Sequence, residues 1–341
     1  MKKIETKNAV GHVICHDITI IVKDQIKDTA FRKGHIVREE DIPQLLSIGK
    51  DHLYVWEKEE GMLHENEAAD ILASVCENAH MKRSPVKEGK IELSATEKGL
   101  FQIDLERLCA INELEDIMIA SRHHNQPVNA GDKLVGTRVI PLVISQEKME
   151  QVKAIGAEKP IFQILPYKRK TAGIVTTGNE VYYKRIQDTF TPVIREKLDV
   201  FDVEVVVHKT VPDEKEKIIE AIRSMKAEGV DMIICTGGMS VDPDDMTPSA
   251  IKESGAKIIS YGAPVLPGAM FLLGYFEDGT PIMGLPGCVM YAKATIFDLI
   301  LPRVLADVKV TKKELAKMGA GGLCLGCENC TFPNCGFGKG V

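Results

Sequence analysis

The chain has 341 residues and a formal net charge of −6, with acidic and basic side chains interspersed along its length. This length fits two compact domains better than one, and the lack of a concentrated Lys/Arg excess excludes a typical nucleic-acid-binding surface. No apolar run is long enough to cross a bilayer, and charged residues interrupt the N-terminus before a signal-like core develops. We therefore expect a cytoplasmic protein that binds a small molecule, without nucleic-acid or membrane partners.

Residues 1–165 show short, mixed signals. β-Branched and apolar stretches predict strands or extended segments, and apolar residues at helical spacing predict helices. The strands are expected at residues 10–14, 52–56, 90–94 and 133–144, and the helices at residues 38–48 and 65–77. This part of the chain is therefore predicted to be an α+β domain.

Prolines and a basic run at residues 158–170 separate this domain from a second one, predicted at residues 170–306. The second domain alternates strand and helix signals, which predicts a three-layer sandwich around a mainly parallel sheet. Strands are expected at residues 172–175, 203–208, 231–235, 257–260 and 281–283, and helices at residues 191–198, 214–226, 248–253 and 289–305.

Three glycine-containing turns follow apolar strands of the second domain, and a helical pattern follows each turn. Glycine lets backbone N–H groups approach an anion and adopt positive φ, and a following helix adds its positive end. In open α/β folds, ligands bind where such turns meet, at the carboxyl edge of the sheet. We therefore expect a phosphate-bearing ligand held by three groups of residues: Thr177, Gly178, Asn179 and Glu180; Thr236, Gly237, Gly238 and Ser240; and Gly284, Pro286 and Gly287.

Carboxylates cluster beside the second turn, at Asp242, Asp244 and Asp245, just before Thr247, which is expected to cap a helix and to take part in binding the ligand. Acids at a helix start can simply complement the helix dipole. Beside an anion-binding turn they repel the ligand unless a hard cation lies between them, which favours a Mg²⁺ site. Asp213, at the end of the preceding strand, is predicted either to cap the next helix or to serve the same site.

The order of these motifs resembles the molybdopterin-binding domain shared by molybdopterin adenylyltransferases and molybdopterin molybdotransferases. The motifs are Thr-Gly-Asn-Glu, Pro-Asp, Thr-Gly-Gly-x-Ser followed by Asp-x-Thr-Pro, and Gly-Leu-Pro-Gly. The resemblance implies that the glycine turns hold the pterin and its terminal phosphate. It also implies that Asp213 and Asp245 are catalytic. Together with the acidic cluster, it leads us to expect Asp242 and Asp245 as the Mg²⁺ ligands.

The long region before residue 170 favours the molybdotransferase form of the family. The implied function is molybdenum cofactor biosynthesis, in which adenylylated molybdopterin is bound and molybdate is inserted with Mg²⁺. Two alternatives stay open: a non-catalytic carrier or sensor of the cofactor that serves a molybdenum enzyme, and a molybdopterin adenylyltransferase. Asn179, which stands where the family usually has Asp, and the lack of a small β domain after residue 306 favour the carrier. A homo-oligomer also stays open.

Residues 312–341 form a glycine-rich tail with the spacing C-x2-C-x2-C-x4-C, from Cys324, Cys327 and Cys330 to Cys335. The other five cysteines occur singly, as expected for thiols in a reducing compartment. Four thiols this close can bind one metal centre, and soft thiolates select zinc or an iron–sulfur cluster. The tail is therefore predicted to be a metal-binding segment that is mobile until it folds around its metal or docks with a partner.

Overall fold

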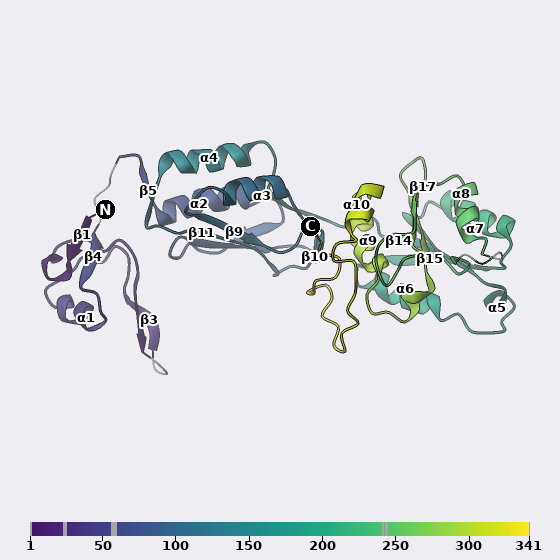
Figure 1. The fold of residues 1–341 in the computed structure, drawn as a ribbon, viewed down its shortest axis with the longest axis horizontal. Coiled ribbons are helices and arrows are strands. Elements are labelled where there is room, and N and C mark those ends of the chain that lie inside the picture. Colours follow the sequence, from purple (N-terminus) through teal and green to yellow (C-terminus); the bar gives the residue numbers. More distant parts are fainter. Residues whose placement is uncertain (1, 23–25, 56–59, 241, 243–244, 341) are drawn as a thin grey trace. The chain divides into compact units, whose positions relative to one another are not determined.

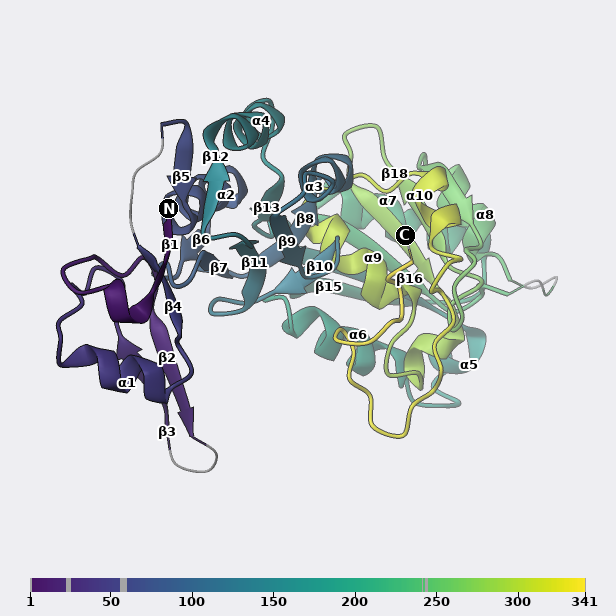
Figure 2. The ribbon, with the colours of Figure 1, turned by 60° about the vertical axis from the view of Figure 1, so that its left-hand side comes forward.

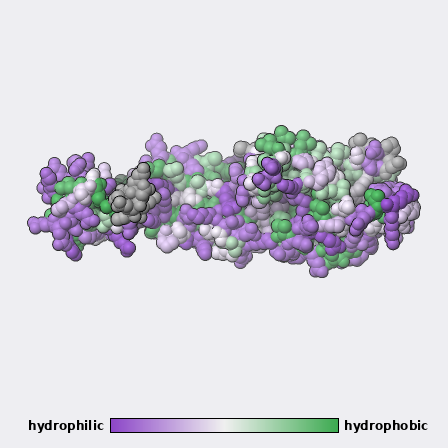
Figure 3. Space-filling view, turned by 90° about the horizontal axis from the view of Figure 1, so that it is seen from below, coloured by the Kyte–Doolittle hydropathy of each residue, from purple (hydrophilic) through white to green (hydrophobic). Residues whose placement is uncertain are grey.

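The structure is a computed structural model that describes residues 2–22, 26–55, 60–240, 242 and 245–340. Its contacts divide the chain into two compact units, one formed by residues up to 97, 103–122 and 129–164, the other by residues 98–102, 123–128 and from 165 onward. Among the described residues, no helix combines the length and apolar character needed to cross a bilayer. Figure 3 shows hydrophilic and hydrophobic side chains mixed over one face of the molecule, as is common for protein surfaces.

The first unit contains a four-stranded antiparallel sheet with helices packed against it (Figure 1). The strand order is β6 (Met81–Arg83), β7 (Lys90–Ala95), β11 (Lys133–Val139) and β9 (Ile117–Ser121). Helices α2 (Glu65–Cys76) and α3 (Leu105–Asn112) contact the sheet, and α4 (Gln146–Ala157) packs on these two helices. The expected α+β character is therefore seen.

The N-terminal residues of this unit form a separate small apolar cluster that includes Ile14, Leu45 and Leu53. Around it lie paired strands β1 (Lys2–Glu5) and β4 (His52–Val55), the hairpin β2 (Ile18–Val22) and β3 (Ile26–Phe31), and helix α1 (Asp41–Ser47).

Several expected elements of the first unit differ in the structure. The strand predicted at residues 10–14 is wrong, since only isolated bridges form there, at Val13 and Ile14. The segment predicted at residues 133–144 is broken into β11 and the short β12 (Val143–Ser145), which pairs with β5 (Met62–His64). Proline lacks the N–H that a ladder needs, and Pro141 lies in the gap. Helices α3 and α4 were not predicted, although the side chains of Asp104 and Ser145 cap them.

The second unit is built on a six-stranded sheet. Its order is β15 (Glu204–Val211), β14 (Thr171–Thr177), β16 (Met232–Thr236), β19 (Pro281–Leu285), β18 (Leu272–Tyr275) and β17 (Lys257–Tyr261). The first four strands are parallel to one another, β18 is antiparallel to β19, and β17 is antiparallel to β18, so only β18 runs in the opposite direction. The mainly parallel sheet is thus confirmed. The strand β18 was not predicted.

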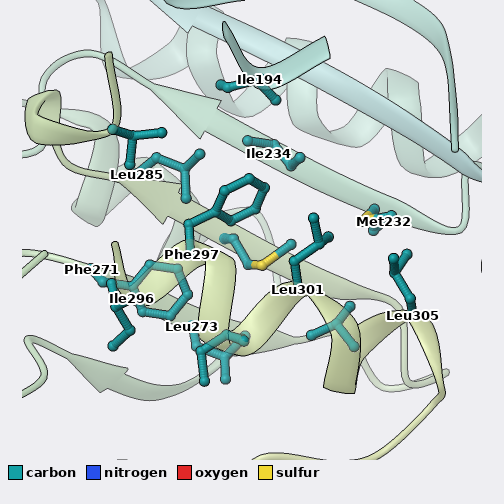
Figure 4. Packing of buried hydrophobic residues seen from close by; sticks show 14 of the residues in the cluster. Ile194, Met232, Ile234, Phe271, Leu273, Leu285, Ile296, Phe297, Leu301 and Leu305 are labelled. Atoms are coloured by element: carbon teal, nitrogen blue, oxygen red, sulfur yellow. The ribbon is translucent and has the colours of Figure 1, made fainter. Parts of the chain in front are cut away.

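Helices cover both faces of this sheet, because successive residues of each central strand point to opposite sides. Ile174 and Ile234 pack in one core with residues of α6 (Phe190–Asp199) and α9 (Ile296–Leu305). Figure 4 shows Ile194, Ile234 and Phe297 meeting there. Neighbouring strand residues face a second core formed with α7 (Lys215–Ala227) and α8 (Thr247–Glu253). The three-layer sandwich is therefore confirmed.

The closing helix predicted from residue 289 begins later, at Ile296. Thr295 caps it: its hydroxyl accepts the Phe297 N–H, and Asp298 completes a capping box. Residues Gly287–Met290 instead form a short 3-10 turn. The third glycine turn is therefore not followed directly by an α-helix.

The cysteine tail follows the short helix α10 (Lys312–Lys317) and packs on the second unit (Figure 2, yellow). Phe337 is 5% exposed and belongs to the same core as Phe297. Leu323 bridges to Leu266, and the Gln126 amide donates a hydrogen bond to Asn334 Oδ1 at 3.1 Å. These contacts fasten the tail at both ends of its cysteine-bearing segment.

Candidate functional site

A cavity of about 450 Å³ opens at the carboxyl edge of β14, β16 and β19. All three glycine turns contribute to its wall, the first through Thr177 and Glu180, the second through residues 236–240 and the last through Pro286 and Gly287. The predicted convergence of turns distant in sequence is therefore present, because parallel strands bring their carboxyl ends to one edge.

The second turn needs glycine at both of its central positions. Gly237 has φ +81°, and a Cβ there would lie 2.2 Å from the Thr177 carbonyl oxygen. Gly238 has φ +54°, and a Cβ there would lie 2.9 Å from Thr247 Oγ1. Thr247 does not cap α8 as predicted: its hydroxyl lies 3.2 Å from Thr177 Oγ1 and joins the first two turns. The backbones of the first and second turns therefore lie close together, and both turns line the cavity in which a ligand could bind.

Two buried oxygen atoms of the cavity wall have no hydrogen-bond partner among the described residues. They are Thr236 Oγ1 and Asp245 Oδ2. Buried polar atoms in proteins are nearly always paired, so these two indicate a missing partner such as a ligand, an ion or water. Asp242 and Glu180 line the same cavity, whereas Asp244 lies outside the described residues.

The oxygen donors of this wall fit a Mg²⁺ ion, which is commonly held by one or two carboxylates together with substrate phosphates. Across the described part of the chain, no three His, Cys, Asp or Glu side chains gather closely enough to form a complete metal site by themselves.

Asp213, predicted to be catalytic, is not among the residues that line the cavity and is hydrogen-bonded to Asn179. The Asn179 N–H donates to Asp213 Oδ2 at 2.8 Å, and the Asp213 N–H donates to Asn179 Oδ1 at 3.4 Å. Gly178, with φ +139°, allows this bend before the single helical turn α5 (Asn179–Tyr182). Gly284 lies within β19, where the thioether of Met239 occupies the space a side chain would need. These residues shape the turns that form the wall.

The other end of the cavity is formed by residues that the sequence analysis did not single out. They are residues of the loop before α6, the first residue of α6 and two methionines: Ile186, Gln187, Asp188, Thr189, Phe190, Met270 and Met290. No glycine pattern or acidic cluster marks this loop in the sequence. Only the tertiary structure shows that it faces the glycine turns.

A network of hydrogen bonds lies under this end of the cavity. The Thr191 hydroxyl donates to Asp188 Oδ2 at 2.6 Å and lies 3.1 Å from Thr176 Oγ1, which in turn lies 3.0 Å from His208 Nε2. Burial favours the neutral carboxyl of Asp188, but hydrogen bonds from Thr191 and Phe190 outweigh it, so its pKa lies below the ordinary value. Burial also lowers the pKa of His208, against the opposing effect of Asp188.

The four tail cysteines are all free thiols and differ in exposure. Cys324 and Cys335 are half-buried against the core of the second unit, whereas Cys327 and Cys330 are exposed. The Lys293 ammonium donates to the Glu328 carbonyl oxygen at 3.2 Å, between the two exposed cysteines.

Native-state alkylation should separate these thiols from the buried ones. Burial raises the pKa of Cys76 to about 12 and also raises that of Cys235, so their thiolates are scarce as well as enclosed. We expect iodoacetamide to modify Cys327 and Cys330 at least about tenfold faster than Cys76 and Cys235, measured by peptide mass spectrometry. Denatured protein is the control, since all sites should then react. Equal rates in the folded protein would contradict the exposures described.

Comparison with known proteins gives two family matches. Residues 173–306 match the family described as the probable molybdopterin binding domain. Residues 3–57 match a domain of unknown function.

Among curated relatives, a CinA-like protein of Mycobacterium sp. (strain MCS) is 41% identical over 81 residues, which cover 24% of this chain and 19% of the relative. The chain thus spans less than a fifth of that relative's length. The molybdopterin molybdenumtransferase of Staphylococcus epidermidis (strain ATCC 12228 / FDA PCI 1200) is 23% identical over 299 residues, which cover 83% of this chain and 66% of the relative.

Two solved structures are also similar. The molybdopterin biosynthesis enzyme MoaB of Thermus thermophilus is 24% identical, with a TM-score of 0.35, and the match covers 42% of this chain and 98% of that one. The tungsten cofactor synthesizing protein MoaB of Pyrococcus furiosus is 23% identical, with a TM-score of 0.35 and the same coverage of 42% and 98%. The family match coincides with the unit that carries the glycine turns. Residues 173–306 of this chain therefore belong to the probable molybdopterin binding domain family.

Proposed function

We propose that this protein binds adenylylated molybdopterin in the cavity of its second unit and inserts molybdate with Mg²⁺, releasing AMP. Gly237 and Gly238 line the cavity, and their positive φ values suit a turn that directs backbone N–H groups at an anionic group of the ligand. Asp242 and Asp245 are the residues that would hold Mg²⁺, which supplies positive charge next to the phosphates.

The observation that carries this proposal is the unpaired Asp245 Oδ2 in the wall that the glycine turns form. A carboxylate oxygen beside an anion-binding turn is electrostatically unfavourable unless a cation joins it to the ligand. Metal-assisted chemistry on a phosphate-bearing cofactor would explain why the glycine turns and the Asp245 carboxylate line one cavity.

The test is a turnover experiment under anaerobic conditions. Purified protein is incubated with adenylylated molybdopterin, Mg²⁺ and molybdate, and AMP is quantified by chromatography. We expect more than one AMP per protein, and none when Mg²⁺ is chelated or molybdate is omitted. Failure to bind adenylylated molybdopterin at all would contradict the proposal.

A second candidate is a non-catalytic carrier or sensor of the cofactor that serves a molybdenum enzyme. The hydrogen bond between Asn179 and Asp213 favours it, because it engages a carboxylate that the catalytic proposal would otherwise use. In the same experiment, a carrier binds the ligand without releasing AMP. An adenylyltransferase would instead consume ATP in the presence of molybdopterin.

We also propose that the tail binds a metal centre through Cys324, Cys327, Cys330 and Cys335. The spacing and the exposure of the two central thiols support it, since thiolates select zinc or an iron–sulfur cluster. Anaerobic purification followed by metal analysis and a visible spectrum distinguishes the two. Protein that retains neither zinc nor iron, and takes up neither on reconstitution, would refute this proposal.

A further inference from the structure

In the hydrogen-bond network under the cavity, the donor of each contact follows from which atoms can only accept a proton. A carboxylate only accepts, so the 2.6 Å contact uses the hydroxyl proton of Thr191. The 3.1 Å contact between Thr191 and Thr176 then takes the proton of Thr176, whose oxygen also lies 3.5 Å from Asp188 Oδ2. His208 Nε2 lies 3.0 Å from Thr176 Oγ1 and 3.2 Å from Thr191 Oγ1, and a proton on Nε2 can serve either contact. The opposite tautomer would leave two hydroxyl oxygens facing each other without a proton between them.

We infer that His208 is a positioning residue of the ligand cavity, which acts on the Asp188 carboxylate through a directed relay of Thr176 and Thr191. In this relay His208 donates to Thr176, the nearer of its two hydroxyl neighbours, Thr176 donates to Thr191, and Thr191 donates to Asp188. Each donation polarises the next hydroxyl and strengthens its hydrogen bond.

The relay connects strands and a loop that are otherwise independent. His208 lies on β15, Thr176 on β14 and Thr191 in the first turn of α6, and Asp188 precedes that helix. Thr176 and Thr191 are 3% and 5% exposed, so water cannot easily replace either hydroxyl. Asp188 Oδ1 already accepts the N–H groups of Phe190 and Thr191. The carboxylate is thus held from three sides while it lines the cavity.

The consequence for the ligand rests on the proposed function. Backbone N–H groups use both lone pairs of Asp188 Oδ1, so Oδ2, which keeps one lone pair beyond the Thr191 hydroxyl, is the acceptor that suits an amino or ring N–H group of a pterin. His208 Nε2 lies 3.7 Å from Asp188 Oδ2. The positive charge of Arg195 helps to lower the pKa of His208. When His208 gains a second proton, its positive charge competes with the ligand for Asp188. The affinity for the pterin should therefore be constant above pH 6.5, the ordinary pKa of histidine, and fall at lower pH as His208 becomes charged.

The first experiment is independent of any ligand. In ¹⁵N-histidine NMR spectra of the full chain at pH 7.5, His208 should be neutral and protonated on Nε2, with the assignment made by the loss of its signal in His208→Gln. A neutral ring protonated on Nδ1 would overturn the relay.

The second experiment measures the affinity for adenylylated molybdopterin between pH 5 and 8 in matched variants. Thr191→Val removes the hydroxyl at nearly constant shape and should weaken binding about tenfold, whereas Thr191→Ser should stay within about threefold of the wild type. His208→Leu should weaken binding similarly, and His208→Gln, which keeps a donor, should bind normally but lose the acid-side fall. Wild-type affinity with an unchanged pH profile in Thr191→Val and His208→Leu would refute the inference. If the wild type itself does not bind, the proposed function fails and the NMR result alone decides the relay.

Discussion

Replacing Gly237 with alanine is expected to abolish ligand binding. The new Cβ would lie 2.2 Å from the Thr177 carbonyl oxygen, a backbone atom that cannot rotate away, at a φ of +81°. The conformational strain and the steric overlap together should lower the free energy of unfolding by about 2–5 kcal/mol. Because the two turns must separate, we expect affinity for adenylylated molybdopterin to fall at least about 100-fold. Urea denaturation and equilibrium dialysis measure the two effects.

Gly229→Ala is the matched control for this substitution. Gly229 has nearly the same φ, +79°, but a Cβ there would meet no described atom within 4 Å. It should therefore lose about 1–2 kcal/mol through backbone strain alone and keep its ligand affinity. If Gly237→Ala bound the ligand as well as Gly229→Ala does, the second turn would not form the binding wall.

Replacing Asp245 with asparagine is expected to reduce AMP release by about 100-fold or more. The substitution keeps the shape of the side chain but removes the charge that would hold Mg²⁺ beside the ligand phosphates, and removal of one transition-state contact typically has an effect of this size. Binding of the ligand without Mg²⁺ should be unchanged or tighter, because a negative charge next to an anion has been removed. Initial rates across a Mg²⁺ titration, together with dialysis in chelator, measure both quantities.

Asp199→Asn is a suitable comparison, because Asp199 is an exposed carboxylate at the end of α6 and does not line the cavity. It should release AMP at the wild-type rate. An Asp245→Asn variant with wild-type turnover at saturating Mg²⁺ would exclude Asp245 from the reaction. No turnover in any variant, with binding retained, would favour the carrier.

Local sequence patterns predicted the second unit well and the first unit only in part. Helix α7, with its single apolar stripe, and strands β14 and β16 appear within a few residues of their expected bounds. Hydrophobic patterns predicted element boundaries less well where a capping residue lies inside an apolar stretch. Residues 289–305 are mostly apolar, so periodicity alone did not show that the helix begins only after the cap at Thr295.

The cavity was predicted only where its residues carry a local signature. Gly237 and Gly238 belong to a glycine turn and Asp245 to the acidic cluster beside it, and both patterns can be recognised in the sequence. All three residues line the cavity. Asp213 has an equally legible position, yet the structure pairs it with Asn179 at 2.8 Å. Whether Asp213 faces the ligand or pairs with Asn179 depends on where the first turn lies in the folded protein. The spacing of residues along the chain does not determine that position.

The sequence by itself determined the alternating α/β architecture of the second unit and the three glycine turns at one sheet edge, because strand direction and turn chemistry are local properties. Only the tertiary structure decided that residues 186–190 line the same cavity as the glycine turns. It alone also joined His208 to Asp188 through two buried threonines. Hydrogen bonds among polar side chains from three separate elements depend on distances of a few tenths of an ångström, and packing of the whole sheet and its helices sets those distances.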